Sequence, residues 1–569
     1  MACFALRQGM LALGAILLIG LFDSCGHVPL DDSKDSSIKG VVVDEHGPVA
    51  SATVRIQTTN HKTTSDDQGN FSLSTSGMGE GSFKLTAWAP GYFCAGPVEA
   101  EVGQADIEIH LEAHSTVDNP DYVWLPSTFH PGQGENQGCA ECHSAAKTDL
   151  AFTLPVDQWL QDTHSQSATN PRFRTMYRGT DMNENQSLPT RYAYSRDYGS
   201  FPLRPDPSQP YFGPGYKLDF PDTAGNCATC HTPAAAIDAP YAVNPTSLTG
   251  VFAEGISCDF CHKIWDVKLD PQNGLPYQNM PGVLSFEFRR PEEGHQFFAG
   301  PFDDVAPGED TFSPLQTQSQ ICAPCHFGIF WDVVVYDSFG EWLRSPYSEP
   351  QGGQTCQACH MPHLGATHFA RPEKGGLARD PETIFSHRML NTLDVEFIRQ
   401  AIAFELQSSW ESEQIITEVS LTNVNAGHDI PTDSPLRHLL LVVRAWDENM
   451  LPLDLLEGET LPEWSGTGDP KKGNYAGLPG KVFAKVLEEL WTSVSPTGAY
   501  WNPTRILYDN RLSPYQKDTS KFVFSAPQRG DVTIEVKLIY RRAYIQLINQ
   551  KGWDIPDLLL EEQEASLHR

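Results

Sequence analysis

Ten of the 13 cysteines stand in five copies of one short pattern, in which two cysteines are separated by two residues and a histidine follows directly. Two thiols at this spacing can add to the two vinyl groups of one porphyrin, and the adjacent imidazole can bind the iron. The pattern therefore predicts five covalently attached c-type haems. The thioether residues are Cys139, Cys142, Cys227, Cys230, Cys258, Cys261, Cys322, Cys325, Cys356 and Cys359. The proximal iron ligands are His143, His231, His262, His326 and His360.

Zinc sites and dithiol redox sites also use paired cysteines. A structural zinc site needs four ligands around one ion, but nothing in zinc chemistry requires a histidine after every pair. A thioredoxin-type redox site needs one such motif rather than five. The repeated pattern therefore favours haem over both alternatives.

The N-terminal 25 residues are expected to be an export signal. Arg7 precedes an apolar run over residues 10–22, which is too short for a typical transmembrane helix and suits the core of a signal peptide. The residues up to Cys25 resemble a bacterial lipoprotein cleavage site, although Phe22 and Asp23 depart from the usual pattern. Lipidation of Cys25 and plain cleavage nearby remain the two alternatives. Either predicts export to the periplasm or the outer cell surface, with lipidated Cys25 as the one expected membrane attachment.

The charge balance excludes one class of partner. Acidic residues number 72 against 40 basic ones, giving a formal net charge of −32. Nucleic-acid binding needs clustered Lys and Arg, so no nucleic-acid partner is expected. Redox partner proteins are expected instead, and their identity is not encoded in any pattern of this chain.

The hydrophobic patterning predicts a multidomain fold. An N-terminal β-sandwich is expected over residues 38–113, a mainly α or irregular pentahaem domain over residues 118–392, and a C-terminal β-sandwich over residues 393–569. Apolar residues at every second position over residues 531–540 support the last. Residues 451–509 are expected to form an irregular insertion in it. Cys94, without a partner cysteine, is expected to be a small buried apolar side chain.

The N-terminal segment resembles the carboxypeptidase regulatory-like family. The resemblance rests on Gly40, Pro48, the turn at residues 67–71, and Gly91 with Tyr92. It implies a transthyretin-like sandwich with a spacer or adhesive role and no catalysis.

Residues 135–370 resemble the tetrahaem cytochromes that accept electrons from hydroxylamine oxidoreductase. The matching features are Trp159 with His164, Asn170 with Phe173, and the stretches at residues 341–347 and 352–362. The resemblance implies that His164, at the end of a helix expected over residues 155–164, is a distal haem ligand. It implies the same role for His368, downstream of the fifth motif.

Five haems with two axial histidines each need ten histidines, and the motifs supply five. Further candidates for distal ligation are His130, His295 and His387. His363 follows a proximal histidine too closely and is expected at the surface or beside a propionate. For His428, a hydrogen bond within a β-loop is favoured over iron ligation. In a second copy of the same local pattern, Tyr347 occupies the position that corresponds to His164. This replacement of histidine by tyrosine predicts either that Tyr347 packs in the core or that one haem iron has an open position.

Three functions remain open. The first is an electron carrier in which closely packed haem irons change only their charge. The second is an oxidoreductase with one open iron that acts on a small nitrogen or sulfur compound. The third is a cytochrome subunit of a cell-surface electron-transfer assembly. No residue is predicted to be catalytic.

Overall fold

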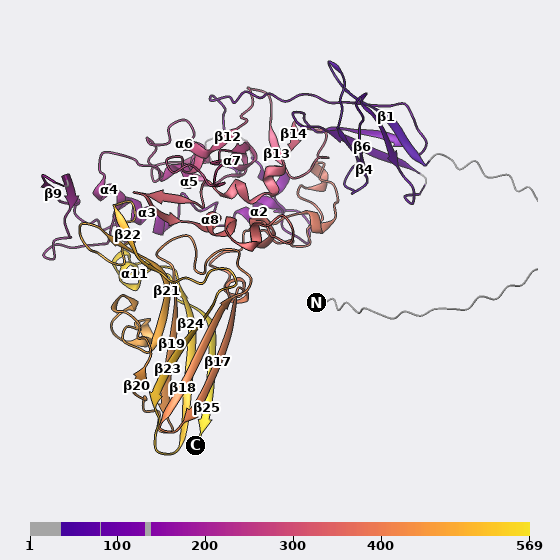
Figure 1. Ribbon diagram of the computed structural model, residues 1–569. Helices are drawn as coiled ribbons and strands as arrows, with labels where there is room; N and C mark the ends of the chain where they lie inside the picture. The colour runs from indigo at the N-terminus through magenta and orange to yellow at the C-terminus, as the bar shows by residue number, and fades with distance from the viewer. Residues whose placement is uncertain (1–35, 80, 131–137, 198) are drawn as a thin grey trace, which may run out of the picture.

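The computed structural model describes residues 36–79, 81–130, 138–197 and 199–569. Two β-sandwiches flank a central region of short helices and loops (Figure 1). The expected signal segment, including Cys25, lies outside the described residues. In the part of the chain that the structure describes, no helix is long and apolar enough to cross a membrane.

The N-terminal sandwich consists of two four-stranded sheets. One contains β1 (Ser37–Asp44), β2 (Gly47–Pro48), β5 (Asn70–Ser74) and β8 (Ile107–His110), and the other contains β3 (Thr53–Ile56), β4 (Lys62–Thr64), β6 (Ser82–Trp88) and β7 (Ala95–Glu101). Strand geometry turns Ile38 and Val42 of β1 inward, and both are fully buried. Asp66 fixes the turn into β5, because its carboxylate accepts hydrogen bonds from the backbone N–H groups of Gln68 and Asn70. The β-sandwich expected here is therefore present.

Polar contacts fix the N-terminal sandwich to the segment 303–311 of the central region. The Arg55 guanidinium lies 2.6 Å from the Asp303 carboxylate. The backbone N–H of Thr58 donates to the Asp304 carboxylate at 2.7 Å. The sandwich is thus held in place by side chains as well as by the connecting chain.

Asp304 also forms a buried ion pair with Arg379, at 2.8 Å with both side chains at most 5% exposed. We expect Asp304→Ala to lower the free energy of unfolding by about 3–5 kcal/mol, because it leaves a buried guanidinium without a counter-charge. Lys374→Ala breaks an exposed pair with Glu141 and should leave stability nearly unchanged, since solvent screens that pair. Urea denaturation of the holoprotein measures both, and equal losses in the two variants would contradict the expectation.

The central region is built from short elements. Its helices are α1 (Ala140–His143), α2 (Pro155–Trp159), α3 (Pro171–Arg178), α4 (Tyr216–Asp219), α5 (Ala228–His231), α6 (Pro233–Ala236), α7 (Cys258–His262), α8 (Ser338–Leu343), α9 (Cys356–His360) and α10 (Val395–Gln400). Its strand pairs are β9 (Tyr192–Ser195) with β10 (Gly199–Pro202), β11 (Ile264–Val267) with β12 (Phe286–Phe288), β13 (Phe298–Gly300) with β14 (Asp310–Phe312), and β15 (Gly328–Phe330) with β16 (Val333–Tyr336). The longest of these helices, α3, has 8 residues. Helices this short are not stable alone in water, so the region depends on what its elements pack against.

The helix expected over residues 155–164 is shorter than predicted. α2 ends at Trp159, and the N–H groups of Gln161 and Asp162 then bond to carbonyls three residues earlier. The Asp162 carboxylate accepts the backbone N–H of His164 at 2.9 Å. This side-chain bond competes with the helical pattern and holds His164 in a turn beyond the helix.

The C-terminal sandwich consists of a four-stranded and a five-stranded sheet. The strands of the four-stranded sheet are, in spatial order, β17 (Ile402–Glu411), β18 (Gln414–Asn423), β23 (Lys517–Ser525) and β20 (Leu455–Glu457). Those of the five-stranded sheet are β22 (Thr504–Asp509), β21 (Gly480–Glu489), β19 (His438–Asp447), β24 (Asp531–Arg541) and β25 (Leu558–His568). Val532, Ile534 and Val536 alternate along β24 and are fully buried between the sheets. A short helix, α11 (Ile545–Lys551), follows β24. The second expected β-sandwich is present.

The prediction of an irregular insertion over residues 451–509 is wrong for three of its parts, which form β20, β21 and β22. β21 pairs with β19 on one side, with Ala484 opposite His438, and with β22 on the other. Val482 and Phe483 are adjacent in the chain, and both are buried. A strand covered on both faces lacks the alternation that reveals a half-buried strand, so its pattern was missed.

Loops at one end of the C-terminal sandwich lie against the central region (Figure 1). The Arg511 guanidinium lies 2.7 Å from the Glu341 carboxylate of α8, and both side chains are at most 5% exposed. The Lys551 ammonium donates to the Pro214 carbonyl at 2.6 Å. These contacts place the loops of this sandwich beside the haem motifs.

Candidate haem sites

Four of the five motifs form one-turn helices, namely α1, α5, α7 and α9, and the fourth motif forms a turn after a short 3-10 helix. Ser257 caps α7 by accepting the N–H of Phe260, and Thr355 caps α9 by accepting the N–H of Ala358. All ten motif cysteines are free and partly exposed. The local fold therefore presents two thiols and one imidazole from each motif.

The proximal histidines are held by their Nδ1 atoms. The acceptors are the carbonyl oxygens of Phe369 for His143 at 2.7 Å, Ser167 for His231 at 3.3 Å, Ala299 for His262 at 2.7 Å and Leu390 for His360 at 2.7 Å. His326 differs, because its Nδ1 lies 3.9 Å from the Asp433 carboxylate. An imidazole fixed through Nδ1 in this way directs Nε2 toward a metal.

The proximal rings are neutral at neutral pH. Burial lowers the pKa of His231 and His360 to about 4 and that of His262 to about 3. Burial also lowers the pKa values of His143 and His326. Neutral imidazole is the form that binds iron, so the donor set fits a c-type haem at each motif.

Three proximal histidines face a second histidine from a distant part of the chain. The ring centroids are 6.3 Å apart for His326 and His164, 6.4 Å for His262 and His387, and 6.2 Å for His360 and His428. Metal–imidazole bonds of about 2.0 Å and a ring half-width of about 1.1 Å would separate the centroids of two axial rings on one metal by about 6.2 Å. The observed separations therefore match pairs of axial ligands.

Hydrogen bonds also hold the second histidine of these pairs in place. Nδ1 of His164 lies 2.7 Å from the Asp162 carboxylate, which also accepts the backbone N–H of Met389 at 2.9 Å. The backbone N–H of His387 donates to the Gln158 side chain at 2.8 Å. The Leu390 carbonyl, in the same segment, accepts the hydrogen bond of His360. The segment 387–390 therefore contacts residues of three candidate haem sites.

His428 lies at a position that the sequence did not favour for ligation. Its Nδ1 is 3.0 Å from the Asp429 carbonyl, as a structural loop hydrogen bond requires. The same bond leaves Nε2 available, and the ring faces His360 across the domain boundary. The C-terminal sandwich therefore places an imidazole beside the fifth motif. The sequence around His428 did not favour this role.

The aromatic neighbours of the other two proximal histidines are phenylalanines. Phe173 stacks on His231 with centroids 3.7 Å apart, and Phe369 lies parallel to His143 at 6.2 Å. Among the described residues, no histidine ring is placed opposite either of them in the manner of the three pairs. The second and first motifs thus differ from the other three.

The structure does not bring the remaining sequence candidates into such pairs. Nε2 of His130 lies 2.7 Å from the Glu254 carboxylate. His295 is 62% exposed and lies 2.7 Å from Glu309. His368 is bonded through Nδ1 to the Thr367 hydroxyl at 2.9 Å and lies parallel to the Phe152 ring. His363, expected at the surface or a propionate, bonds through Nδ1 to the Ile384 carbonyl at 3.0 Å.

Two other sequence expectations are settled by contacts. The Tyr347 hydroxyl donates to the Val424 carbonyl at 3.2 Å, and its ring stacks on Tyr515. This agrees with the packing role for Tyr347 rather than with an open iron opposite it. Cys94 is 4% exposed, as a buried apolar side chain should be.

Thiols of different motifs are electrostatic neighbours, which shows the order of the motifs in space. The Cys258 thiol raises the pKa of Cys139, and the Cys356 thiol raises that of Cys322. The Cys230 thiol raises the pKa of Cys325. The first motif thus adjoins the third, and the fourth adjoins both the fifth and the second. Cys261 of the third motif raises the pKa values of both fourth-motif cysteines. The third motif therefore lies near the fourth and connects the first motif to the others.

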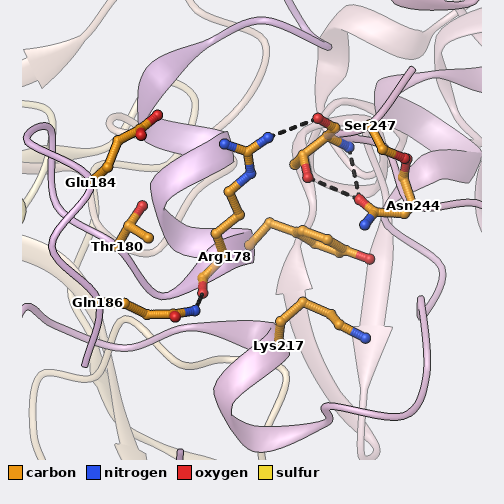
Figure 2. Close-up of a pocket in the computed structure, with 9 residues that line it drawn as sticks. Arg178, Thr180, Glu184, Gln186, Lys217, Asn244 and Ser247 are labelled. Carbon is orange, nitrogen blue, oxygen red and sulfur yellow. Dashed lines mark hydrogen bonds between the residues drawn. The ribbon is translucent and has the colours of Figure 1, made fainter. Parts of the chain in front are cut away.

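A separate surface pocket of about 370 Å³ lies between α3 and α4 (Figure 2). Its cations are already engaged, since Arg178 donates to the Thr246 carbonyl at 2.8 Å and Lys217 donates to the Thr223 carbonyl at 2.9 Å. Around the motifs and elsewhere in the described residues, no three His, Cys, Asp or Glu side chains converge as ligands of a bare ion would.

The chain was compared with solved structures, with curated proteins and with protein-family models. The fold is similar to a penta-heme cytochrome c552 from Thermochromatium tepidum, at 18% identity and a TM-score of 0.49, over 75% of this chain and 97% of that chain. A type II cohesin–X-dockerin complex from Acetivibrio cellulolyticus aligns with 16% of this chain and 67% of that chain, at 15% identity and a TM-score of 0.12. No curated protein matches the chain. Residues 37–112 match the carboxypeptidase regulatory-like domain family, so the N-terminal sandwich is a domain of that family.

Proposed function

We propose that the chain is an exported pentahaem c-type cytochrome that carries electrons between redox partner proteins. The observation that carries this proposal is the set of three facing imidazole pairs, each with one member in a haem-attachment motif. Iron held between two imidazoles has no free position for a substrate and changes only its charge. The resemblance of residues 135–370 to electron-accepting tetrahaem cytochromes agrees with a carrier.

The proposed axial pairs join parts of the chain that are far apart in sequence. His164 follows the first motif but is assigned to the haem of His326 in the fourth. His428, from the C-terminal sandwich, is assigned to the haem of His360. Such ligands would fix the haems relative to one another, which an electron relay requires.

The neighbouring thiols support a continuous relay. The proposed route runs from the first motif through the third to the fourth, which adjoins both the second and the fifth. An electron entering at one end would reduce one iron at a time, and each reduced iron would return to the ferric state as it passes the electron on.

We expect the mature protein to carry five covalently attached haems, because all five attachment motifs are intact. Intact-protein mass spectrometry should show five haem additions, and each Cys-to-Ser double variant of one motif should show four. A wild-type count below five would contradict the proposal. The same spectrum reports whether the chain begins at a lipidated Cys25, as the proposed export and surface attachment allow.

A second candidate function is an oxidoreductase with an open iron. The observation that favours it is the phenylalanine, rather than histidine, environment of His143 and His231. Low-temperature electron paramagnetic resonance of the oxidised protein separates the candidates. Low-spin signals from all five irons support the carrier, and a high-spin signal whose reduced form binds carbon monoxide supports the enzyme acting on a small nitrogen or sulfur compound.

A further inference from the structure

Three arginines gather where the C-terminal sandwich meets α3. His438 of β19 is paired with Arg541 of β24, so Arg437 and Arg542 lie opposite each other one residue beyond the paired strands. Opposite residues of an antiparallel pair point to the same face of the sheet. Arg172, in the first turn of α3, completes the cluster. Burial and the charges of Arg542 and Arg437 together lower the pKa of Arg172 to about 10.

These three cations have too few counter-charges in the described part of the chain. Asp433 is the nearby carboxylate, 3.8 Å from Arg437, whose guanidinium also donates to the Thr432 carbonyl at 3.2 Å. The guanidinium groups of Arg172 and Arg542 form no ion pair or hydrogen bond with the described residues. Nε of Arg542 is buried without an acceptor. The cluster therefore retains two unbalanced positive charges.

The other groups that face the cluster do not supply these charges. Tyr540 lies near all three arginines, and Tyr336 lies near Arg437. Both phenols remain neutral at neutral pH, because burial raises their pKa values. Partly buried cations without counter-charges are unfavourable, so a pair of anions at this place would stabilise the fold.

The cluster lies beside the second motif. Phe173, which follows Arg172 directly, stacks on the His231 ring at 3.7 Å with an angle of 6° between the planes. A haem held by His231 would therefore lie close to Phe173 and to Arg172, which precedes it. Haem carries two propionate carboxylates, which equals the number of unbalanced charges.

We propose that Arg172, Arg437 and Arg542 bind the two propionates of the haem attached to Cys227 and Cys230. Guanidinium groups bind carboxylates through two parallel hydrogen bonds, which suits this charge and shape. The inference rests on the proposed haem content, and it goes further by giving the C-terminal sandwich a role at the second haem. It also accounts for two partly buried arginines that the protein fold leaves without counter-charges.

The test is a redox titration of the holoprotein with Arg172→Gln, Arg542→Gln and the double variant. The potential of one haem should fall, most in the double variant, because unbalanced propionates stabilise ferric iron. Arg172→Lys keeps the charge and should retain most of the original potential. Arg178→Gln, on the same helix but bonded to the Thr246 carbonyl, is the matched control and should change nothing. Potentials that are equal in all variants would overturn the proposal.

Two further measurements separate the remaining outcomes. In a Cys227→Ser/Cys230→Ser background, which lacks the second haem, Arg172→Gln should leave the other potentials unchanged, and a persisting shift would overturn the assignment. Phosphate or nitrite added to the wild type should cause no saturable spectral change. A saturable change that Arg172→Gln abolishes would show that a diffusible oxyanion occupies the arginines instead. A wild-type mass lacking the second haem would contradict the proposed function itself, whereas five haems with unmoved potentials would contradict only this inference.

Discussion

His164→Ala should convert one low-spin iron to high-spin while all five haems remain attached. The thioethers do not involve His164, so the covalent haem count should stay at five. The His164 ring faces His326 at 6.3 Å and is oriented by Asp162. Its loss removes one axial donor and should shift the potential of that haem. Electron paramagnetic resonance and redox titration measure the two effects.

The control for this variant is His295→Ala. His295 is 62% exposed, bonds to Glu309 and should be replaceable without any spectral change. His428→Ala should behave as His164→Ala does, but at a different iron, so the double variant should show two high-spin irons. A wild-type spectrum in His164→Ala would defeat the assignment of His164 as a ligand and the crossed pairing with it.

Without covalent haem, the central region should lose its fold while the two sandwiches keep theirs. The helices described for that region have at most 8 residues, which is too short for stability without tertiary packing. The C-terminal sandwich instead has a continuous apolar core that includes Leu439, Phe483 and Val536.

A full-length variant with all ten motif cysteines changed to Ser tests this expectation. Hydrogen exchange followed by mass spectrometry should show fast exchange over residues 118–392 and protected amides in β18, β19 and β24. The holoprotein serves as the reference for protection in the central region. Equal protection of that region in both forms would show that it folds without its cofactor.

The most specific predictions from the sequence depend only on neighbouring residues. Each motif spans five residues, so spacing alone predicts the ten cysteines and five histidines as haem-attachment residues. The strands around Val42 and Val536 were recognised because half-buried strands alternate between apolar and polar positions. The carboxypeptidase regulatory-like domain was recognised from its turns, and the family match over residues 37–112 confirms it.

Predictions failed where burial or side-chain contacts override the local pattern. β21 is covered on both faces, which hides its alternation and made residues 451–509 look irregular. The helix over residues 155–164 was extended too far, because Asp162 diverts the chain into a turn around His164. Neither effect depends on a residue type that a propensity scale would single out.

The sequence by itself determined the five Cys-x-x-Cys-His motifs, and with them the prediction of five haems and of the residues that attach them. Only the tertiary structure decided which histidines face them, because an axial pair joins segments separated by many residues and by a domain boundary. His428 and His387 were not distinguishable from His130 and His295 by spacing, yet only the first two lie opposite a proximal ring. The cluster of Arg172, Arg437 and Arg542 arises in the same way, from strand register and domain packing. Covalent attachment is a local property of five residues, whereas ligation and charge balance are properties of the packed molecule.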